Sequence, residues 1–173
     1  MKDFIDAMQC RTAVTAVGPS ALRGQGKGVL KGTQEFLSKI DLSELTNINR
    51  NTFNQWLDEQ TDSLLIELPI RNKPWGTCRK ALNLFLRDSL YNQYLCEAFI
   101  INAIEQWLEI PLDSAVAKGL KREAGRGRLP MWPGLKNLRK DVSEDFQRFA
   151  ERLAEKRGIA RVHLDIYLWI ENR

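Results

Sequence analysis

Asp113 is the first residue whose type and position suggest chemistry. It follows Pro111 and stands directly ahead of residues 114–124, where apolar side chains recur at helical spacing. Proline stops one helix and aspartate commonly caps the next, so the plain interpretation of Asp113 is an N-cap. A carboxylate in this position can also activate a nucleophile or stabilise a developing positive charge. Both interpretations predict that Asp113 lies at a helix start.

A second candidate is the stretch 73–92, where a Pro-x-Gly turn ending at Gly76 leads into a predicted helix capped by Thr77. Arg79 and Lys80 fall in the first turn of that helix. Free backbone N–H groups at a helix start attract phosphate, and nearby cations strengthen the attraction. One interpretation is an ordinary helix start with solvated charges. The other is a hairpin that grips phosphate through Gly76, Thr77 and Arg79.

Positive charge is concentrated between residues 118 and 140. This segment holds eight Lys and Arg side chains against Glu123 alone, a net charge of +7, whereas the whole chain carries +4. The rest of the chain is therefore slightly acidic, and the segment predicts a local polyanion-binding face. The predicted contacts to nucleic acid are Lys118, Lys121, Arg122, Arg126, Arg128 and Trp132. The alternative is a solvated basic loop whose tryptophan packs back on the core.

The elements that must position these residues are predicted to be helices. Apolar residues recur at helical spacing in residues 29–40, 51–68, 77–91, 93–109, 114–124 and 142–156. The most apolar of these segments, 93–109, is the expected central core helix. Residues 159–172 contain β-branched and aromatic residues typical of strands, but helix is favoured because no partner strand is apparent. We therefore expect an all-α fold in one compact domain over residues 1–173, with a flexible glycine-rich turn at 18–28.

The bulk composition limits the class of protein. A chain of 173 residues with 43% hydrophobic residues is long and apolar enough to bury a core. Cys10, Cys78 and Cys96 lack paired spacing and His163 is the one histidine, which argues against a disulfide framework, a zinc site or an iron–sulfur cluster. No apolar run approaches the roughly 20 residues that cross a bilayer. We expect a cytoplasmic protein without cofactor, metal cluster or membrane segment.

Taken in order, these pieces resemble the helix-hairpin-helix DNA glycosylase superfamily. Residues 111–117 (PLDSAVA) match the family segment that carries a catalytic aspartate. Residues 73–81 (KPWGTCRKA) match the family hairpin in part, and the stretch from His163 to Trp169 is similar to the closing helix of some members. The resemblance covers residues 51–172.

The resemblance implies an all-helical fold with a DNA-binding groove, in which Asp113 activates the attacking group. Lys80 would be an amine nucleophile that forms a Schiff base, as in bifunctional members, and the backbone around Gly76 would hold a DNA phosphate. A target base would be flipped into a pocket against an aromatic such as Trp75 or Trp132. The hairpin has one glycine where the family has two, and the interval of 33 residues from Lys80 to Asp113 is long for the family. Retention of the fold without catalysis is therefore an alternative.

Three functional classes remain open at this point. The first is a DNA-repair glycosylase that excises a damaged base with Asp113, and with Lys80 as a candidate nucleophile. The second is a non-catalytic nucleic-acid-binding module of the helix-hairpin-helix type. The third is a helical protein-interaction domain that binds no polyanion. The expected partner for the first two is nucleic acid, with DNA implied by the resemblance, through the basic face at 118–140.

Overall fold

The computed structural model describes residues 1–22, 24–69 and 74–171, and none of these lies in a strand. The α-helices are α1 (Lys2–Ala16), α2 (Val29–Leu37), α3 (Arg50–Glu67), α4 (Trp75–Tyr91), α5 (Gln93–Phe99), α6 (Ser114–Ala124), α7 (Lys140–Arg157) and α8 (Leu164–Glu171). Short 3₁₀ helices lie between them, namely η1 (Leu42–Leu45), η2 (Ile101–Trp107), η3 (Leu135–Asn137) and η4 (Arg161–His163). No helix within the described ranges combines the length and apolar character needed to cross a bilayer. The predicted all-α class is confirmed.

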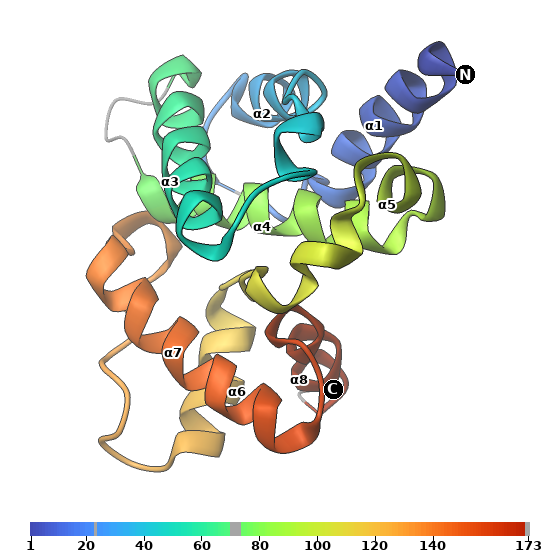
Figure 1. Cartoon of the computed structure of the whole chain (residues 1–173). Coiled ribbons are helices and arrows are strands. Elements are labelled where there is room, and N and C mark those ends of the chain that lie inside the picture. Colours follow the sequence, from blue (N-terminus) through green and yellow to red (C-terminus); the bar gives the residue numbers. More distant parts are fainter. Residues whose placement is uncertain (23, 70–73, 172–173) are drawn as a thin grey trace.

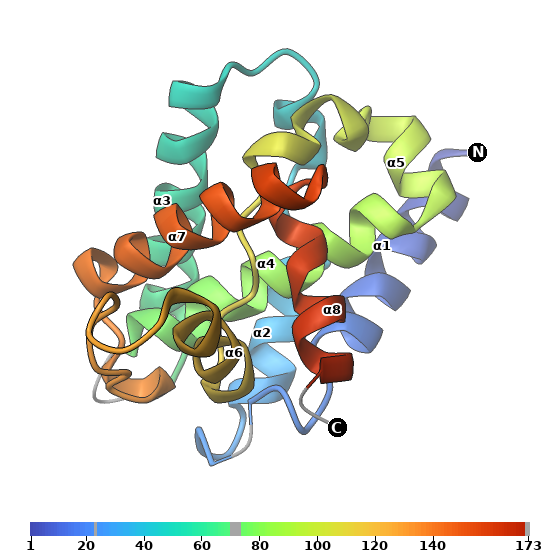
Figure 2. The ribbon, with the colours of Figure 1, turned by 90° about the horizontal axis from the view of Figure 1, so that it is seen from below.

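Helix α4 runs through the centre of the molecule (Figure 2). Twelve of its residues are buried, and it packs against α1 and α3 on one side and against α7 and η3 on the other. The sequence predicts the central helix at 93–109 instead, and this prediction is wrong. That segment breaks at Ile100, whose φ of 53° lies in the left-handed region, into α5 and η2. Because neither glycine nor proline marks the break, apolar periodicity alone continues the helix across it.

Buried apolar side chains form two clusters. One is built mainly by α1 to α5 with η1 and η2, and the other by α6, α7 and α8 together with Leu129 and Leu138. We call these groups of elements the N-terminal lobe and the C-terminal lobe. Figure 1 shows the N-terminal lobe above the C-terminal lobe, with α4 along the boundary. The segment 108–113 crosses from one lobe to the other.

The helix ends agree in part with the sequence. Asp113 accepts backbone N–H groups at the start of α6, as predicted. Asp41 caps η1 in the same way, and Gly158 ends α7 in a left-handed conformation. Serine is a common N-cap residue, but Ser143 is buried within α7, because that helix begins at Lys140. The C-terminal segment is helical, as favoured over a strand.

The start of α4 also differs from the prediction. The helix begins at Trp75 with Pro74 as its N-cap residue, so Thr77 lies inside the first turn and caps nothing. The fixed φ of proline suits a helix start, which accounts for the earlier beginning. The expected hairpin residue Lys73 lies outside the described residues.

Gly76 stands where α4 meets η3 of the other lobe. A Cβ atom at this position would lie 2.6 Å from the carbonyl oxygen of Leu135 and 2.6 Å from Cβ of Leu138. Both distances are far below normal contact, so only glycine lets the two backbones approach this closely. The glycine therefore serves the packing between the lobes.

We expect Gly76→Ala to lower the free energy of unfolding by about 1–3 kcal/mol, because the added methyl group overlaps a backbone carbonyl. Urea denaturation of the protein without DNA measures this. Gly18→Ala is the matched control, since nothing lies within 4 Å of a Cβ built there, and it should leave stability nearly unchanged. Equal unfolding free energies for the two variants would contradict the close approach at Gly76.

Candidate functional site

The side chains of Lys80 and Asp113 meet at the boundary between the two lobes. Lys80 Nζ, from the buried first half of α4, lies 3.3 Å from Asp113 Oδ2 at the start of α6. The Lys80 side chain is 9% exposed and that of Asp113 is 37% exposed. The amine also donates to the carbonyl oxygen of Ala21 at 3.3 Å. Two residues 33 positions apart in the sequence thus form one partly accessible ion pair.

The two carboxylate oxygens of Asp113 have different partners. Oδ1 accepts hydrogen bonds from the backbone N–H groups of Ala115 at 2.9 Å and Val116 at 3.0 Å. Oδ2 faces the Lys80 amine. The N-cap interpretation is therefore confirmed, and it does not compete with a chemical role, because the cap orients the carboxylate and leaves its second oxygen at the ion pair.

The segment that delivers Asp113 is held by two side chains of the C-terminal lobe. Gln147 Nε2 donates to the carbonyl oxygen of Ile110 at 2.8 Å, and its Oε1 accepts from the N–H of the same residue at 3.2 Å. Arg161 donates to the carbonyl oxygens of Trp107 at 2.8 Å and Leu108 at 3.2 Å. Both side chains are buried. Neither residue was recognised from the sequence, since a single polar residue among apolar ones carries no signal of such a role.

A cavity of about 670 Å³ opens beside the ion pair. Helix α4 supplies one wall with residues one or two turns apart, namely Lys80, Leu84, Arg87, Asp88 and Tyr91. The opposite walls come from residues 15–21 and from Asp165, Ile166 and Trp169 of α8. This volume is in the range of small-molecule pockets.

A second hollow of about 510 Å³ begins on the other side of the same pair. It shares Ser20, Ala21, Lys80, Asp113 and Ala115 with the cavity and adds Gln25, Ser114 and residues 134–137. The Lys80–Asp113 pair therefore lies where two concave surfaces meet. The predicted flexible turn at 18–28 contributes to the walls of both.

Arg87, Asp88 and Asp165 form a second charged cluster in the cavity. The Arg87 guanidinium lies 2.7 Å from Asp88 Oδ1 and also pairs with Asp165 Oδ2. Burial raises the pKa of Asp165 above its ordinary value, and Arg87 opposes the shift. These residues carry no motif, and the cluster exists because α8 folds back beside α4, which the sequence alone does not show.

Tyr91 and His163 close the far end of this cluster. The Tyr91 hydroxyl lies 2.8 Å from His163 Nδ1, and His163 Nε2 lies 2.6 Å from Glu105. The two rings stack with centroids 5.6 Å apart. His163 thus links η4 to Tyr91 of α4 and to Glu105 of η2. Burial raises the pKa of Tyr91 to about 12, with Asp165 adding to the rise and Arg87 opposing it.

The predicted phosphate contacts at the start of α4 lie in the interior. Gly76, Thr77 and Arg79 are all buried. Thr77 Oγ1 contacts Gln25 at 3.2 Å, and Gly76 packs against η3. A direct contact with phosphate at this point has no support in this arrangement, because the helix starts earlier than the sequence predicts.

The Arg79 guanidinium forms ion pairs within the protein. Its guanidinium pairs with Asp58 and lies 3.4 Å from Glu109, and it stacks over the Trp75 ring at 4.9 Å. Arg79 therefore stabilises the contact between α3, α4 and the segment that crosses between the lobes. This arrangement gives no support to the prediction that Arg79 contacts DNA.

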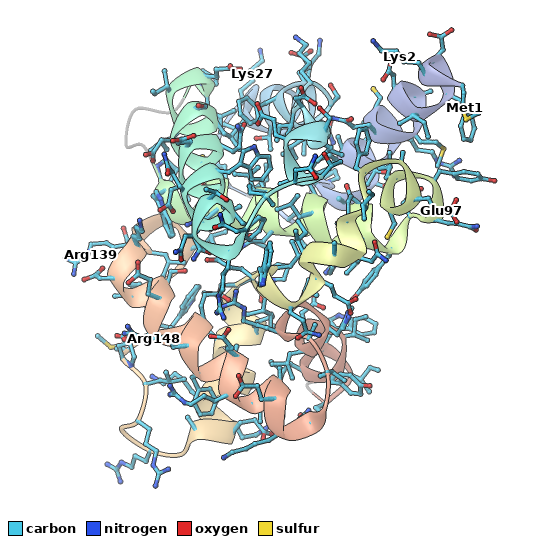
Figure 3. All side chains as sticks on the ribbon, viewed as in Figure 1. Met1, Lys2, Lys27, Glu97, Arg139 and Arg148 are labelled. Carbon is cyan, nitrogen blue, oxygen red and sulfur yellow. The ribbon has the colours of Figure 1, made fainter. Side chains whose placement is uncertain are left out.

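The basic segment 118–140 divides into paired and unpaired side chains. Arg122 pairs with Glu171 at 2.6 Å, Arg139 with Asp141 and Lys140 with Asp58, the last two at 2.5 Å. Figure 3 shows Arg139 extending outward from the start of α7. Among the residues that the structure describes, no acidic side chain pairs with Lys118, Lys121, Arg126, Arg128 or Lys136.

Trp132 is partly buried within this segment. Its Nε1 donates to Ser114 Oγ at 3.2 Å, and its ring meets the Phe146 ring edge-on at 5.6 Å between centroids. This arrangement agrees with the alternative in which Trp132 packs back on the core. The neighbouring Met131 is 83% exposed. The described residues contain no group of three or more His, Cys, Asp or Glu side chains suited to a metal ion.

We expect Tyr91→Phe to remove a phenol whose ionisation is shifted to higher pH. Because the pKa of Tyr91 is raised in the folded protein, this residue stabilises the fold fully below pH 10, and the contribution is lost as pH rises toward about 12. Tyrosinate absorbance followed by pH titration measures the ionisation, and unfolding at several alkaline pH values measures the stability. Identical alkaline titrations of wild type and Tyr91→Phe would contradict the buried position of this hydroxyl.

The described structure brings together a lysine–aspartate pair, a cavity and a second hollow at the boundary of two helical lobes. Comparisons of the chain with family models, with curated proteins and with solved structures found no match.

Proposed function

We propose that this protein is a DNA-binding enzyme of the helix-hairpin-helix glycosylase type that removes a base from DNA. The observation that carries the proposal is the convergence of Lys80 and Asp113 at 3.3 Å beside a cavity. The family resemblance named both residues, Asp113 through the segment 111–117 and Lys80 through the partial hairpin match. Their meeting in space supports a common role.

The arrangement of the elements supports the same proposal. The resemblance implies an all-helical fold with a groove, and the described helices form two lobes with concave surfaces where they meet. Asp113 stands at the start of α6, as the matched motif requires, with its carboxylate oriented by two backbone N–H groups. We propose that the fold is of glycosylase type on these grounds.

The proposed reaction breaks the bond between the sugar carbon C1′ and the base nitrogen. The electron pair of that bond leaves with the base, which takes up a proton, and the sugar develops positive charge that the Asp113 carboxylate stabilises. In the simplest version water attacks C1′ and transfers its proton to Asp113. In the other version the Lys80 ammonium first passes a proton to Asp113, and the free amine attacks C1′ as the bond to the base breaks. The nitrogen then loses a second proton, and the sugar ring opens with protonation of its ring oxygen to leave a Schiff base between Lys80 and C1′.

The unpaired basic side chains supply the proposed DNA contacts. Lys118 lies one turn beyond Ser114 on the exposed side of α6, and Ser114 lines the second hollow. Lys136 lines the same hollow. Arg126 and Arg128 are exposed in the loop after α6. Positive charge thus continues from the ion pair along the C-terminal lobe, on a path that suits a phosphate backbone.

We expect Asp113→Asn to reduce base release by roughly 10²–10⁴-fold, because the amide can neither take a proton nor stabilise a cation. The substitution keeps the cap, since asparagine caps helices as well as aspartate does. Asp41→Asn at the start of η1 is the matched control, because Asp41 is also a capping aspartate but lies outside the groove. The measurement is release of base from duplexes that carry defined lesions, under single-turnover conditions. Absence of release from every substrate, or equal release by wild type and Asp113→Asn, would overturn the catalytic role.

The role of Lys80 has a separate test. Borohydride reduces a Schiff base to a stable amine, so a Lys80 nucleophile predicts a covalent protein–DNA adduct that Lys80→Arg abolishes. Lys39→Arg changes an exposed lysine of the N-terminal lobe and should leave the adduct intact. Base release without any adduct assigns attack to water, and an adduct that survives Lys80→Arg would contradict the assignment of the nucleophile.

We expect the double variant Arg126→Ala/Arg128→Ala to weaken DNA binding. Each phosphate that these side chains no longer neutralise should flatten the dependence of log affinity on log salt by about 1. Arg148→Ala is the control, because Arg148 is exposed on α7 but pairs with Asp145. Fluorescence anisotropy at several salt concentrations measures both the affinity and the slope. An unchanged slope would place the DNA contacts elsewhere.

A non-catalytic DNA-binding module is the second candidate. The low exposure of the Lys80 side chain, 9%, favours it, because a nucleophile must be reached by its substrate. This candidate predicts salt-dependent DNA binding with no base release and no borohydride adduct. The same assays therefore distinguish the two.

A further inference from the structure

The second hollow carries an exposed lysine without an ion-pair partner. Lys136, in η3 of the C-terminal lobe, lines this hollow of about 510 Å³. Its amine reaches toward the glycine-rich segment of the N-terminal lobe, since a Cβ atom built at Gly24 would lie 3.9 Å from Lys136 Nζ. Within the described parts of the chain no acidic side chain pairs with this amine. The hollow therefore offers a ligand one positive charge that the protein does not neutralise.

Uncharged hydrogen-bond donors line the same hollow. Thr77 donates its hydroxyl to Gln25 Oε1 at 3.2 Å, and the Gln25 amide nitrogen makes no hydrogen bond to any residue that the structure describes. Ser114 Oγ accepts from Trp132 Nε1 at 3.2 Å, which leaves the Ser114 hydroxyl proton for another acceptor. Gln25 and Ser114 both line the hollow with Lys136. A ligand that accepts several hydrogen bonds fits this set of side chains.

The two concave surfaces beside the Lys80–Asp113 pair differ in charge. Besides the pair, the charged lining of the cavity holds two carboxylates and one guanidinium, so carboxylates outnumber cations there. The second hollow adds Lys136 alone to the pair, which gives two cations against one carboxylate. An anion is therefore repelled by the charges of the cavity and attracted by those of the second hollow.

We propose that the second hollow binds a backbone phosphate next to the reactive sugar, with Lys136 as its charged ligand and Gln25 and Ser114 as hydrogen-bond donors. This inference rests on the proposed function, since it takes the sugar of the target nucleotide to lie at the Lys80–Asp113 pair. The nucleotide then spans the pair, with its base toward the cavity and a neighbouring phosphate in the hollow. The site differs from the predicted hairpin contact, because the start of α4 lies in the interior.

Replacement of single phosphates by neutral methylphosphonates tests this contact. The probe is a duplex that carries a tetrahydrofuran in place of the target nucleotide, and fluorescence anisotropy measures its affinity. For the wild-type protein, a methylphosphonate at one of the two phosphates that flank the tetrahydrofuran should lower the affinity about tenfold, because a hydrogen bond between charged groups is lost. The same replacement at the end of the duplex should have little effect.

The variant Lys136→Ala connects this effect with one side chain. It should bind the unmodified duplex about tenfold more weakly than the wild type does. Neutralising the same flanking phosphate should then cost no further affinity, because the interaction is already absent. Lys39→Ala removes an equal charge from an exposed position of the N-terminal lobe outside the hollow, and it should keep the wild-type sensitivity. Circular dichroism checks that both variants are folded.

Equal sensitivity of wild type and Lys136→Ala to the flanking methylphosphonates would overturn the phosphate site, and so would a wild-type protein that is insensitive at both flanking phosphates. Either result leaves the catalytic proposal standing if base release depends on Asp113. Coupling between Lys136 and a flanking phosphate in a protein that releases no base would retain the phosphate site and overturn the catalytic proposal alone. Absence of DNA binding would overturn both.

Discussion

A lysine whose side chain is nine-tenths buried needs a partner, and in this protein the partner comes from the other lobe. Lys80 is carried on the central helix α4, where a bare ammonium group would be costly, and Asp113 supplies the compensating charge at 3.3 Å. The contact requires that α6 begin at one particular point beside α4. The packing of Gly76 against η3 and the hydrogen bonds of Gln147 and Arg161 to the crossing segment fix this point.

The same constraint shapes the concave surfaces around the pair. Helix α8 packs against α6 and thereby brings Asp165 to Arg87 of α4. The cavity between them is thus a consequence of how the C-terminal lobe docks. The polar groups around the cavity differ in their pairing. Lys80 and Asp113 pair with each other, whereas one carboxylate oxygen of Asp165, in the Arg87 cluster, has no hydrogen-bond partner.

The structural features that depend on neighbouring residues were predicted correctly from the sequence. The all-α class and the cap at Asp113 each depend on neighbouring residues, and each is observed. The prediction of one helix over residues 93–109 was wrong, because neither glycine nor proline marks the break at Ile100. The roles proposed for Gly76, Thr77 and Arg79 depended on where α4 begins, and a start at Trp75 places all three in the interior.

Contacts between segments that are far apart in the chain could not be predicted from the sequence. The family resemblance implied roles for Lys80 and Asp113 in one reaction, but nothing in the sequence showed that their side chains meet. Arg87, Tyr91 and Asp165 were not recognised, since their proximity arises from the docking of α8 on α4. The basic segment 118–140 is a further case: its composition is clear from the sequence, but which charges are neutralised by partners such as Asp58 and Glu171 depends on the tertiary structure.

The central claim is that Asp113 stabilises positive charge on a DNA sugar between the two lobes. The most direct measurement is the affinity for a duplex that carries a cationic pyrrolidine in place of one deoxyribose, compared with the same duplex carrying a neutral tetrahydrofuran. The account predicts that the wild-type protein binds the cationic duplex about a hundredfold or more tightly than the neutral one, and that Asp113→Asn abolishes this preference. Equal affinity for the two duplexes, or a preference that survives in Asp113→Asn, would contradict it.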